Sequence, residues 1–287
     1  MYGKMLIAVD GTETSMHALE QALVLARSEE SRVTLVSVVP TYDGDLRIMG
    51  DKRVLESMRR PNEQALEQGV TLAESKGVGV RAVLAEGDPV EEILTLAEET
   101  GADCLALGKR GNFYSDLIPI GSVASKIARL SAMDVLLVPN HKPLRLDRII
   151  APLDGSAPSL AAGRRAVSLA ARYGSALSLV TVYELPIEGF VRNPDMDKAF
   201  HDKTTAFQKP LLDLAEEKGA RNVQAMIRQG IPVYKVLTEM IRQEDAGLVI
   251  MGSAGRSDFH RLLLGSVAER VVGSGAAPVL LVKKEAR

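Results

Sequence analysis

The chain has 287 residues, 46% of them hydrophobic and 25% charged, and 35 basic against 37 acidic side chains leave a formal net charge of −2. This balance argues against a protein held on nucleic acid by a broad basic surface, and the apolar content excludes a mainly disordered chain. A single cysteine, Cys104, excludes an intrachain disulfide and a cysteine-rich zinc site. Apolar runs are too short for a membrane span or a signal-peptide core, so we expect no membrane contact, no export and a cytoplasmic location.

The first half of the chain alternates between short apolar runs, which predict strands, and apolar residues at helical spacing, which predict helices. Asp88 and Pro89 are a typical start of one of these helices, Gly101 is a typical end, and Pro61 is expected to start or kink another. In chain order the pattern predicts a strand at residues 5–9, a helix at 15–28, a strand at 33–39, a helix at 53–76, a strand at 80–85, a helix at 89–100, a strand at 104–107, a helix at 121–132 and a strand at 135–138.

The second half repeats the first at a shift of 144 residues. Asp10-Gly11-Thr12 falls on Asp154-Gly155-Ser156, and residues 135–138 fall on 279–282. In the middle of the repeat, Gly87 and Pro89 match Gly230 and Pro232 at a shift of 143. Solenoid repeats have periods of roughly 20–50 residues, so this period is a duplicated domain. We therefore predict two domains, 1–142 and 143–287, joined in the polar, Pro-containing stretch 140–145.

Strands that are apolar on both faces and alternate with helices are typical of a parallel sheet covered on both sides. Right-handed crossovers between such strands produce a doubly wound α/β domain. The predicted fold class is therefore α/β, with two tandem doubly wound domains that each contain a five-stranded parallel sheet and helices on both faces.

Two loops in each half follow strand ends, where sheets of this kind bind ligands. One is the Asp-Gly after the first strand, and the other is a Gly-x2-Gly-x9-Gly-Ser pattern after the fourth strand, at Gly108 in the first half and Gly252 in the second. Glycine lets a ligand approach the backbone, and a Gly-Ser pair that opens a helix offers amide hydrogens and a hydroxyl to an anion. Turn glycines and helix-capping Asp and Ser residues are the competing structural interpretation.

These motifs resemble the ATP-binding branch of the universal stress protein family, and the stretch 252–271 is an especially close match. The resemblance implies that Asp10 and Asp154 lie beside the base and ribose, and that Val38 and Val182 meet the adenine. It also implies that the glycines and serines hold phosphates, with Mg or Mn as the accompanying cation, and that the strand order is 3-2-1-4-5. The candidate nucleotide-binding residues are Pro152, Asp154, Val182, Met251, Gly252, Gly255, Arg256, Gly265, Ser266 and Val267 in the second half, and Asp10, Val38, Gly108, Gly111, Gly121, Ser122 and Val123 in the first.

No dinucleotide fingerprint or Walker-type motif follows the first strand, and of four histidines only His260 falls in a candidate ligand loop. The sequence therefore favours an ATP-binding regulatory or stress-response protein over a fast enzyme. Three alternatives stay open: a ligand-free protein–protein scaffold, a slow ATP hydrolase, and an enzyme acting on an adenylated substrate. The apolar last strands, 135–138 and 279–282, are expected at sheet edges, where they would pair as an intrachain pseudo-dimer or across two chains in a homodimer.

The two halves differ inside the glycine-rich loop. Small residues separate the first two glycines in the second half, where the first half has long cationic side chains: Ser253 and Ala254 against Lys109 and Arg110. The nine-residue span also contains Arg256 and Arg261 in the second half, against Asn112 and Leu117 in the first. Lys109 and Arg110 could add phosphate-binding charge, or their bulk could narrow the entrance. We expect the second domain to be the tighter site.

Overall fold

The structure is a computed structural model that describes residues 1–41, 52–109, 120–184, 196–255 and 264–283. It divides into two compact units, Met1–His141 and Lys142–Arg287. Within the described ranges no helix is both long and apolar enough to cross a membrane.

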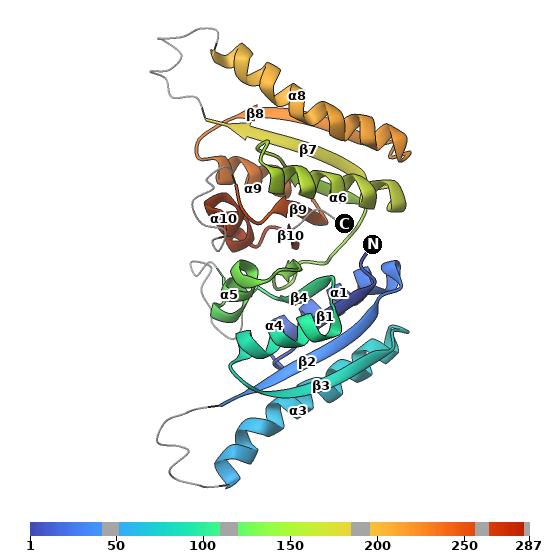
Figure 1. Cartoon of the computed structure of the whole chain (residues 1–287), viewed down its shortest axis with the longest axis vertical. Helices are drawn as coiled ribbons and strands as arrows, with labels where there is room; N and C mark the ends of the chain where they lie inside the picture. Colours follow the sequence, from blue (N-terminus) through green and yellow to red (C-terminus); the bar gives the residue numbers. More distant parts are fainter. Residues whose placement is uncertain (42–51, 110–119, 185–195, 256–263, 284–287) are drawn as a thin grey trace. The chain divides into compact units, whose positions relative to one another are not determined.

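The first unit alternates strands and helices as the sequence pattern predicts (Figure 1). Its strand pairs are all parallel, and their order is β3-β2-β1-β4-β5. The expected strand order is thus confirmed for this unit. Its described elements are β1 (Lys4–Ala8), α1 (Glu13–Glu29), β2 (Arg32–Pro40), α3 (Lys52–Ser75), β3 (Val80–Gly87), α4 (Pro89–Thr100), β4 (Cys104–Gly108), α5 (Ser122–Leu130) and β5 (Asp134–Val138).

The second unit repeats the same arrangement, and its parallel strands follow the order β8-β7-β6-β9-β10. Counted from its own first strand, this is again the order 3-2-1-4-5. Its described elements are β6 (Arg148–Pro152), α6 (Ala157–Tyr173), β7 (Ala176–Tyr183), α8 (Met196–Glu217), β8 (Val223–Gln229), α9 (Val233–Gln243), β9 (Leu248–Gly252), α10 (Ser266–Ser274) and β10 (Val279–Val282).

Each sheet is covered by two helix pairs, α1 with α3 and α4 with α5 in the first unit, and α6 with α8 and α9 with α10 in the second. The central strands β1 and β6 are buried because helices lie on both faces, as with Leu6, Ile7, Ile149 and Ile150, which have at most 1% of their surface exposed. The carboxyl ends of β1 and β4, and of β6 and β9, are therefore neighbours, which brings the two predicted ligand loops of each unit together.

Local chemistry explains both ends of α4. The Asp88 carboxylate accepts the backbone N–H groups of Val90 and Glu91 at 2.8 and 3.1 Å, and Gly101 ends α4 in the left-handed conformation, as its sequence predicts. Pro61 lies inside α3, so of its two expected roles it does not start the helix, and the kink stays a prediction. Each of β5 and β10 pairs with the fourth strand of its own unit, β4 or β9, and the pairing expected between these last strands stays a prediction.

Candidate functional site

The loop after the first strand has two hydrogen bonds in common between the units, and the second unit adds one from a serine hydroxyl. In the second unit, Asp154 Oδ1 accepts the Ser156 N–H at 2.9 Å and its hydroxyl at 2.6 Å, while Ser159 Oγ accepts the Asp154 N–H at 3.3 Å. In the first unit, Asp10 Oδ1 accepts the Thr12 N–H at 3.0 Å, and Ser15 Oγ accepts the Asp10 N–H at 3.2 Å. The aspartate therefore shapes its own turn, which fixes its carboxylate at the strand end.

The first glycine of each Gly-x2-Gly pair has a packing role that the sequence did not reveal. A Cβ on Gly252 would lie 2.8 Å from the Pro158 carbonyl carbon and 2.9 Å from the Ser159 nitrogen. A Cβ on Gly108 would lie 3.0 Å from the Thr14 carbonyl oxygen. These glycines allow the start of α6 or α1 to approach the end of the fourth strand. Close helix packing therefore requires glycine at these positions.

The next glycines bring the two loops of the second unit together. The position of a Cβ on Gly255 is 3.2 Å from Asp154 Oδ2, and that of a Cβ on Gly265 is 3.4 Å from the Gly255 nitrogen. The Gly265 N–H also donates to the Ser253 carbonyl at 2.9 Å. The carboxylate, the glycine-rich loop and the start of α10 thus form one continuous wall.

Helix α10 begins at this wall with Gly265 as its N-cap residue, so the cap supplies no side-chain hydrogen bond. The first N–H groups of a helix have no partner within the helix and carry the positive end of its dipole. Ser266 is exposed at the first helical position, where its hydroxyl is available to a ligand. The arrangement is a ready-made site for an anionic group such as a phosphate.

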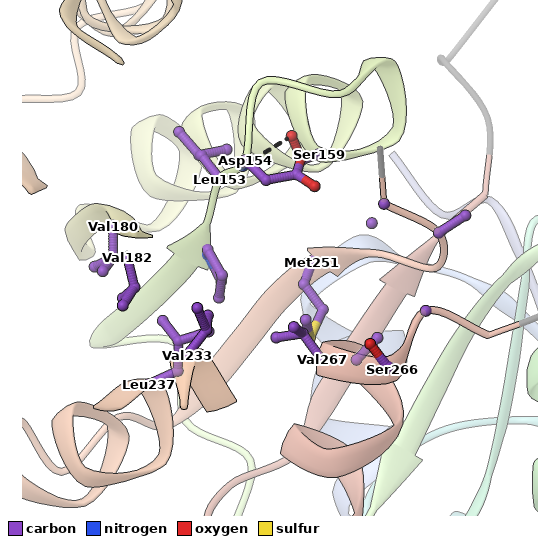
Figure 2. A pocket seen from close by; sticks show the side chains of 16 residues that line it. Leu153, Asp154, Ser159, Val180, Val182, Val233, Leu237, Met251, Ser266 and Val267 are labelled. Carbon is purple, nitrogen blue, oxygen red and sulfur yellow. Dashed lines mark hydrogen bonds between the residues drawn. The ribbon is translucent and has the colours of Figure 1, made fainter. Parts of the chain in front are cut away.

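A cavity of about 360 Å³ connects this helix start to an apolar pocket, a size within the range of ordinary small-molecule sites. Figure 2 shows the apolar side chains from β7 and α9 on one side of the cavity, and Ser266 and Val267 on the other. The cavity is lined by Pro152, Leu153, Asp154, Ser159, Val180, Val182, Val233, Leu237, Met251, Gly252, Ala254, Gly255, Gly265, Ser266, Val267 and Ala268.

The predicted residues of the second half therefore come together, with one exception. Of the ten named from the sequence, nine line the cavity, and Arg256 lies outside the described residues. The sequence analysis missed the walls made by Val233 and Leu237 on α9. These two residues are four apart and follow the repeated Gly and Pro at 230 and 232. That spacing places both side chains on one face of a helix, and it was the signal in the sequence that could have identified them.

In the first unit the equivalent backbone is preserved. The Gly121 N–H donates to the Lys109 carbonyl at 2.9 Å, as Gly265 does to Ser253, and Gly121 is likewise the N-cap of α5 without a side-chain hydrogen bond. Asp10 and Gly108 lie at the ends of neighbouring strands, Val38 lies in β2, and Ser122 and Val123 begin α5. Gly111 and Arg110 lie outside the described residues, as do His260 and Arg261 in the second unit.

A buried tyrosine ends β7 next to the cavity residue Val182. Tyr183 follows Val182 directly, and its hydroxyl donates to the Asp197 carboxylate at the start of α8. Burial, together with that carboxylate, raises the pKa of Tyr183 to about 12. This tyrosine is therefore neutral at physiological pH and serves to attach α8 to the sheet. Among the described residues, no group of three or more His, Cys, Asp or Glu side chains could hold a metal ion alone.

Comparisons with known proteins cover both units. A sequence model of the universal stress protein family matches residues 1–139 and 145–283. A universal stress protein of Mycolicibacterium smegmatis is 24% identical over 98% of this chain and 97% of its own length. The universal stress protein YxiE of Bacillus subtilis is 30% identical over 48% of this chain and 99% of its own. The crystal structure of a universal stress protein from Archaeoglobus fulgidus aligns with a TM-score of 0.72 at 20% identity, covering 98% of this chain and 96% of that one.

Proposed function

Because this chain belongs to the universal stress protein family, with two domains of that family in tandem, we propose that it is an ATP-binding regulatory protein whose main nucleotide site is the cavity of the second unit. One observation carries the proposal: a single cavity joins an apolar pocket, an aspartate at a strand end and a helix start without a side-chain cap. An adenine nucleotide has the matching sequence of parts, namely a flat base, a ribose with two hydroxyls, and phosphates.

Each part of the nucleotide would contact a different set of cavity residues. The base would lie against Val180, Val182 and Leu237, which offer apolar contact. Asp154, whose Oδ1 already holds its own turn, would present its second carboxylate oxygen to the ribose hydroxyls. The phosphates would accept hydrogen bonds from the first N–H groups of α10 and from the Ser266 hydroxyl.

The cavity residues would hold a divalent cation only together with oxygen atoms of the bound nucleotide. Mg²⁺ and Mn²⁺ prefer oxygen ligands, and Mg²⁺ commonly binds through one or two carboxylates, substrate phosphates and water. Asp154 is the carboxylate that lines the cavity, so the phosphates and water would supply the other ligands. When bound, the cation would offset phosphate charge next to the carboxylate.

The proposal also covers the first unit, as a second nucleotide-binding domain within 1–142. Its support is the repeated backbone: the same aspartate turn and the same N-cap glycine at the start of the helix after the fourth strand. The side chains of its glycine-rich loop differ, so we propose a weaker site there.

The test is to purify the full chain, denature it, and identify any released nucleotide by mass spectrometry, followed by calorimetric titration of the nucleotide-free chain with ATP. We expect adenine nucleotide in the supernatant or saturable ATP binding. Absence of both would overturn the proposal and favour a ligand-free scaffold. Release of ADP from bound ATP over hours would instead indicate slow hydrolysis at the same site.

A further inference from the structure

The helix after the third strand, α4 in the first unit and α9 in the second, starts differently in the two units. In the first unit, Asp88 caps α4 from within its own loop, and the Val90 N–H donates to its carboxylate at 2.8 Å. In the second unit the N-cap residue of α9 is Pro232, which provides no side-chain hydrogen bond. There the equivalent N–H, that of Val233, donates to Glu184 Oε1 at 3.1 Å. The cap thus comes from the end of β7, 49 residues earlier in the chain.

The sequence shows that this is an exchange of capping residues. At the shift that aligns Pro89 with Pro232, the counterpart of Asp88 is Ile231, whose side chain cannot accept a hydrogen bond. Ile231 has 66% of its surface exposed. Conversely, at the shift of 144 residues that aligns β2 with β7, the counterpart of Glu184 in the first unit is Pro40, which has no acceptor on its side chain. Each unit therefore has one of the two carboxylates.

The position of this cap matters because both elements that it joins line the cavity. Val182, two residues before Glu184, and Val233, the residue that Glu184 caps, both line the apolar end of the cavity. A second hydrogen bond, from the Gly230 N–H to the Tyr183 carbonyl at 3.1 Å, joins the same two segments. The distance between the β7 wall and the α9 wall therefore depends on contacts made at the end of β7.

We propose that Glu184 is a positioning residue for the base end of the nucleotide site: its carboxylate holds the start of α9 against β7 and sets the width of the base pocket. This inference rests on the proposed nucleotide-binding function. It assigns Glu184 no contact with the ligand. Loss of a helix cap is a modest effect, so removing the carboxylate should weaken binding about three- to fivefold rather than abolish it.

The experiment compares Glu184→Ala and Glu184→Gln with the parent in the full chain, by calorimetric titration with ATP, adenosine and inorganic tripolyphosphate. Glu184→Ala should lower the affinity for ATP and for adenosine about three- to fivefold and leave tripolyphosphate binding unchanged, because the phosphates bind at α10. Glu184→Gln keeps an oxygen acceptor and should retain most of the affinity. A role limited to general stability would weaken all three ligands together.

Two further variants sharpen the test. Ile231→Asp in the Glu184→Ala background restores a carboxylate at the position of Asp88 and should recover ATP affinity. Asp88→Ala removes the cap in the first unit and should leave the tighter ATP site unchanged. If the parent binds ATP and Glu184→Ala binds it equally well, this inference is wrong and the nucleotide site stands. If the parent binds no ATP, the proposed function falls and this inference falls with it.

Discussion

The two units share a backbone and differ in the side chains that surround it. In both, an aspartate holds the turn after the first strand, and a glycine precedes the helix after the fourth. Yet a Cβ on Gly155 would lie 2.9 Å from the Phe207 ring, whereas a Cβ on Gly11 would lie 3.4 Å from the Ala65 Cβ and 3.7 Å from the Pro61 carbonyl oxygen. The helix cap and the glycine-rich loop differ as well. The duplicated chain thus keeps the aspartate turn and the N-cap glycine, and varies the helix cap after the third strand and the side chains of the glycine-rich loop.

The largest expected difference concerns stability at the glycines that end β4 and β9. Gly252→Ala would place a Cβ 2.8 Å from backbone of α6, whereas the closest atoms to a Cβ in Gly108→Ala are 3.0 Å away in Thr14. Overpacking typically costs about 1–3 kcal/mol, and Gly252→Ala should lie at the upper end. Urea unfolding of the full chain measures both, with Gly79→Ala as the control because a Cβ there meets nothing within 4 Å. Equal stability of Gly252→Ala and the parent would contradict the packing role.

The next effect concerns phosphate binding in the second unit. Gly265→Val should place branched methyl groups between the glycine-rich loop and the start of α10 and weaken ATP binding at least tenfold, about 1.4 kcal/mol. Gly265→Ala is the matched control, since its Cβ would lie at an ordinary contact distance of 3.4 Å from the Gly255 nitrogen. Titration calorimetry of both variants gives the comparison. A folded Gly265→Val protein with parental affinity would show that the phosphates bind elsewhere.

A smaller expected difference lies between the ATP affinities of the two sites. In the full chain, Gly265→Val disables the second site, so the remaining ATP affinity is that of the first unit. Gly121→Val disables the first site, so the remaining affinity is that of the second unit. We expect the second site to bind about threefold more tightly, because Ser253 and Ala254 leave its entrance open where Lys109 and Arg110 add bulk. Tighter binding by the Gly265→Val variant would reverse the ranking and indicate that the cationic side chains add phosphate contacts.

The smallest expected effect is a dependence of stability on pH, which appears only at alkaline pH. The folded pKa of Tyr183, about 12, lies above the ordinary tyrosine value of 10.0, so the fold favours the neutral phenol. The stability that this group contributes is fully present below pH 10 and is lost as pH rises towards 12. The first unit has Val39 at the equivalent position and lacks this dependence. Unfolding of the parent and of Tyr183→Phe should therefore converge at high pH; a constant difference from pH 8 to 12 would contradict the assignment.

Much of this molecule could be read from its sequence, because the signals are local and occur twice. Alternating apolar runs and helical periodicities predict the strands and helices, and the shift of 144 residues identifies the duplication. Strand order and the choice of ligand loops came from the family resemblance and from the rule that ligands bind at strand ends. Nine of the ten residues named in the second half line one cavity for that reason.

Other features depend on contacts between segments distant in the chain, and only the tertiary structure decided them. The sequence marked Gly252 as a glycine that admits a ligand, but the approach of α6 shows why a Cβ is excluded there. Val233 and Leu237 became part of the site only when α9 packed beside β7. The exchange of Asp88 for Glu184 as the helix cap is equally hidden, because no spacing rule connects the carboxylate that follows β7 to an N–H 49 residues later. Local periodicity determines which elements form, whereas the packing of those elements decides which side chains meet.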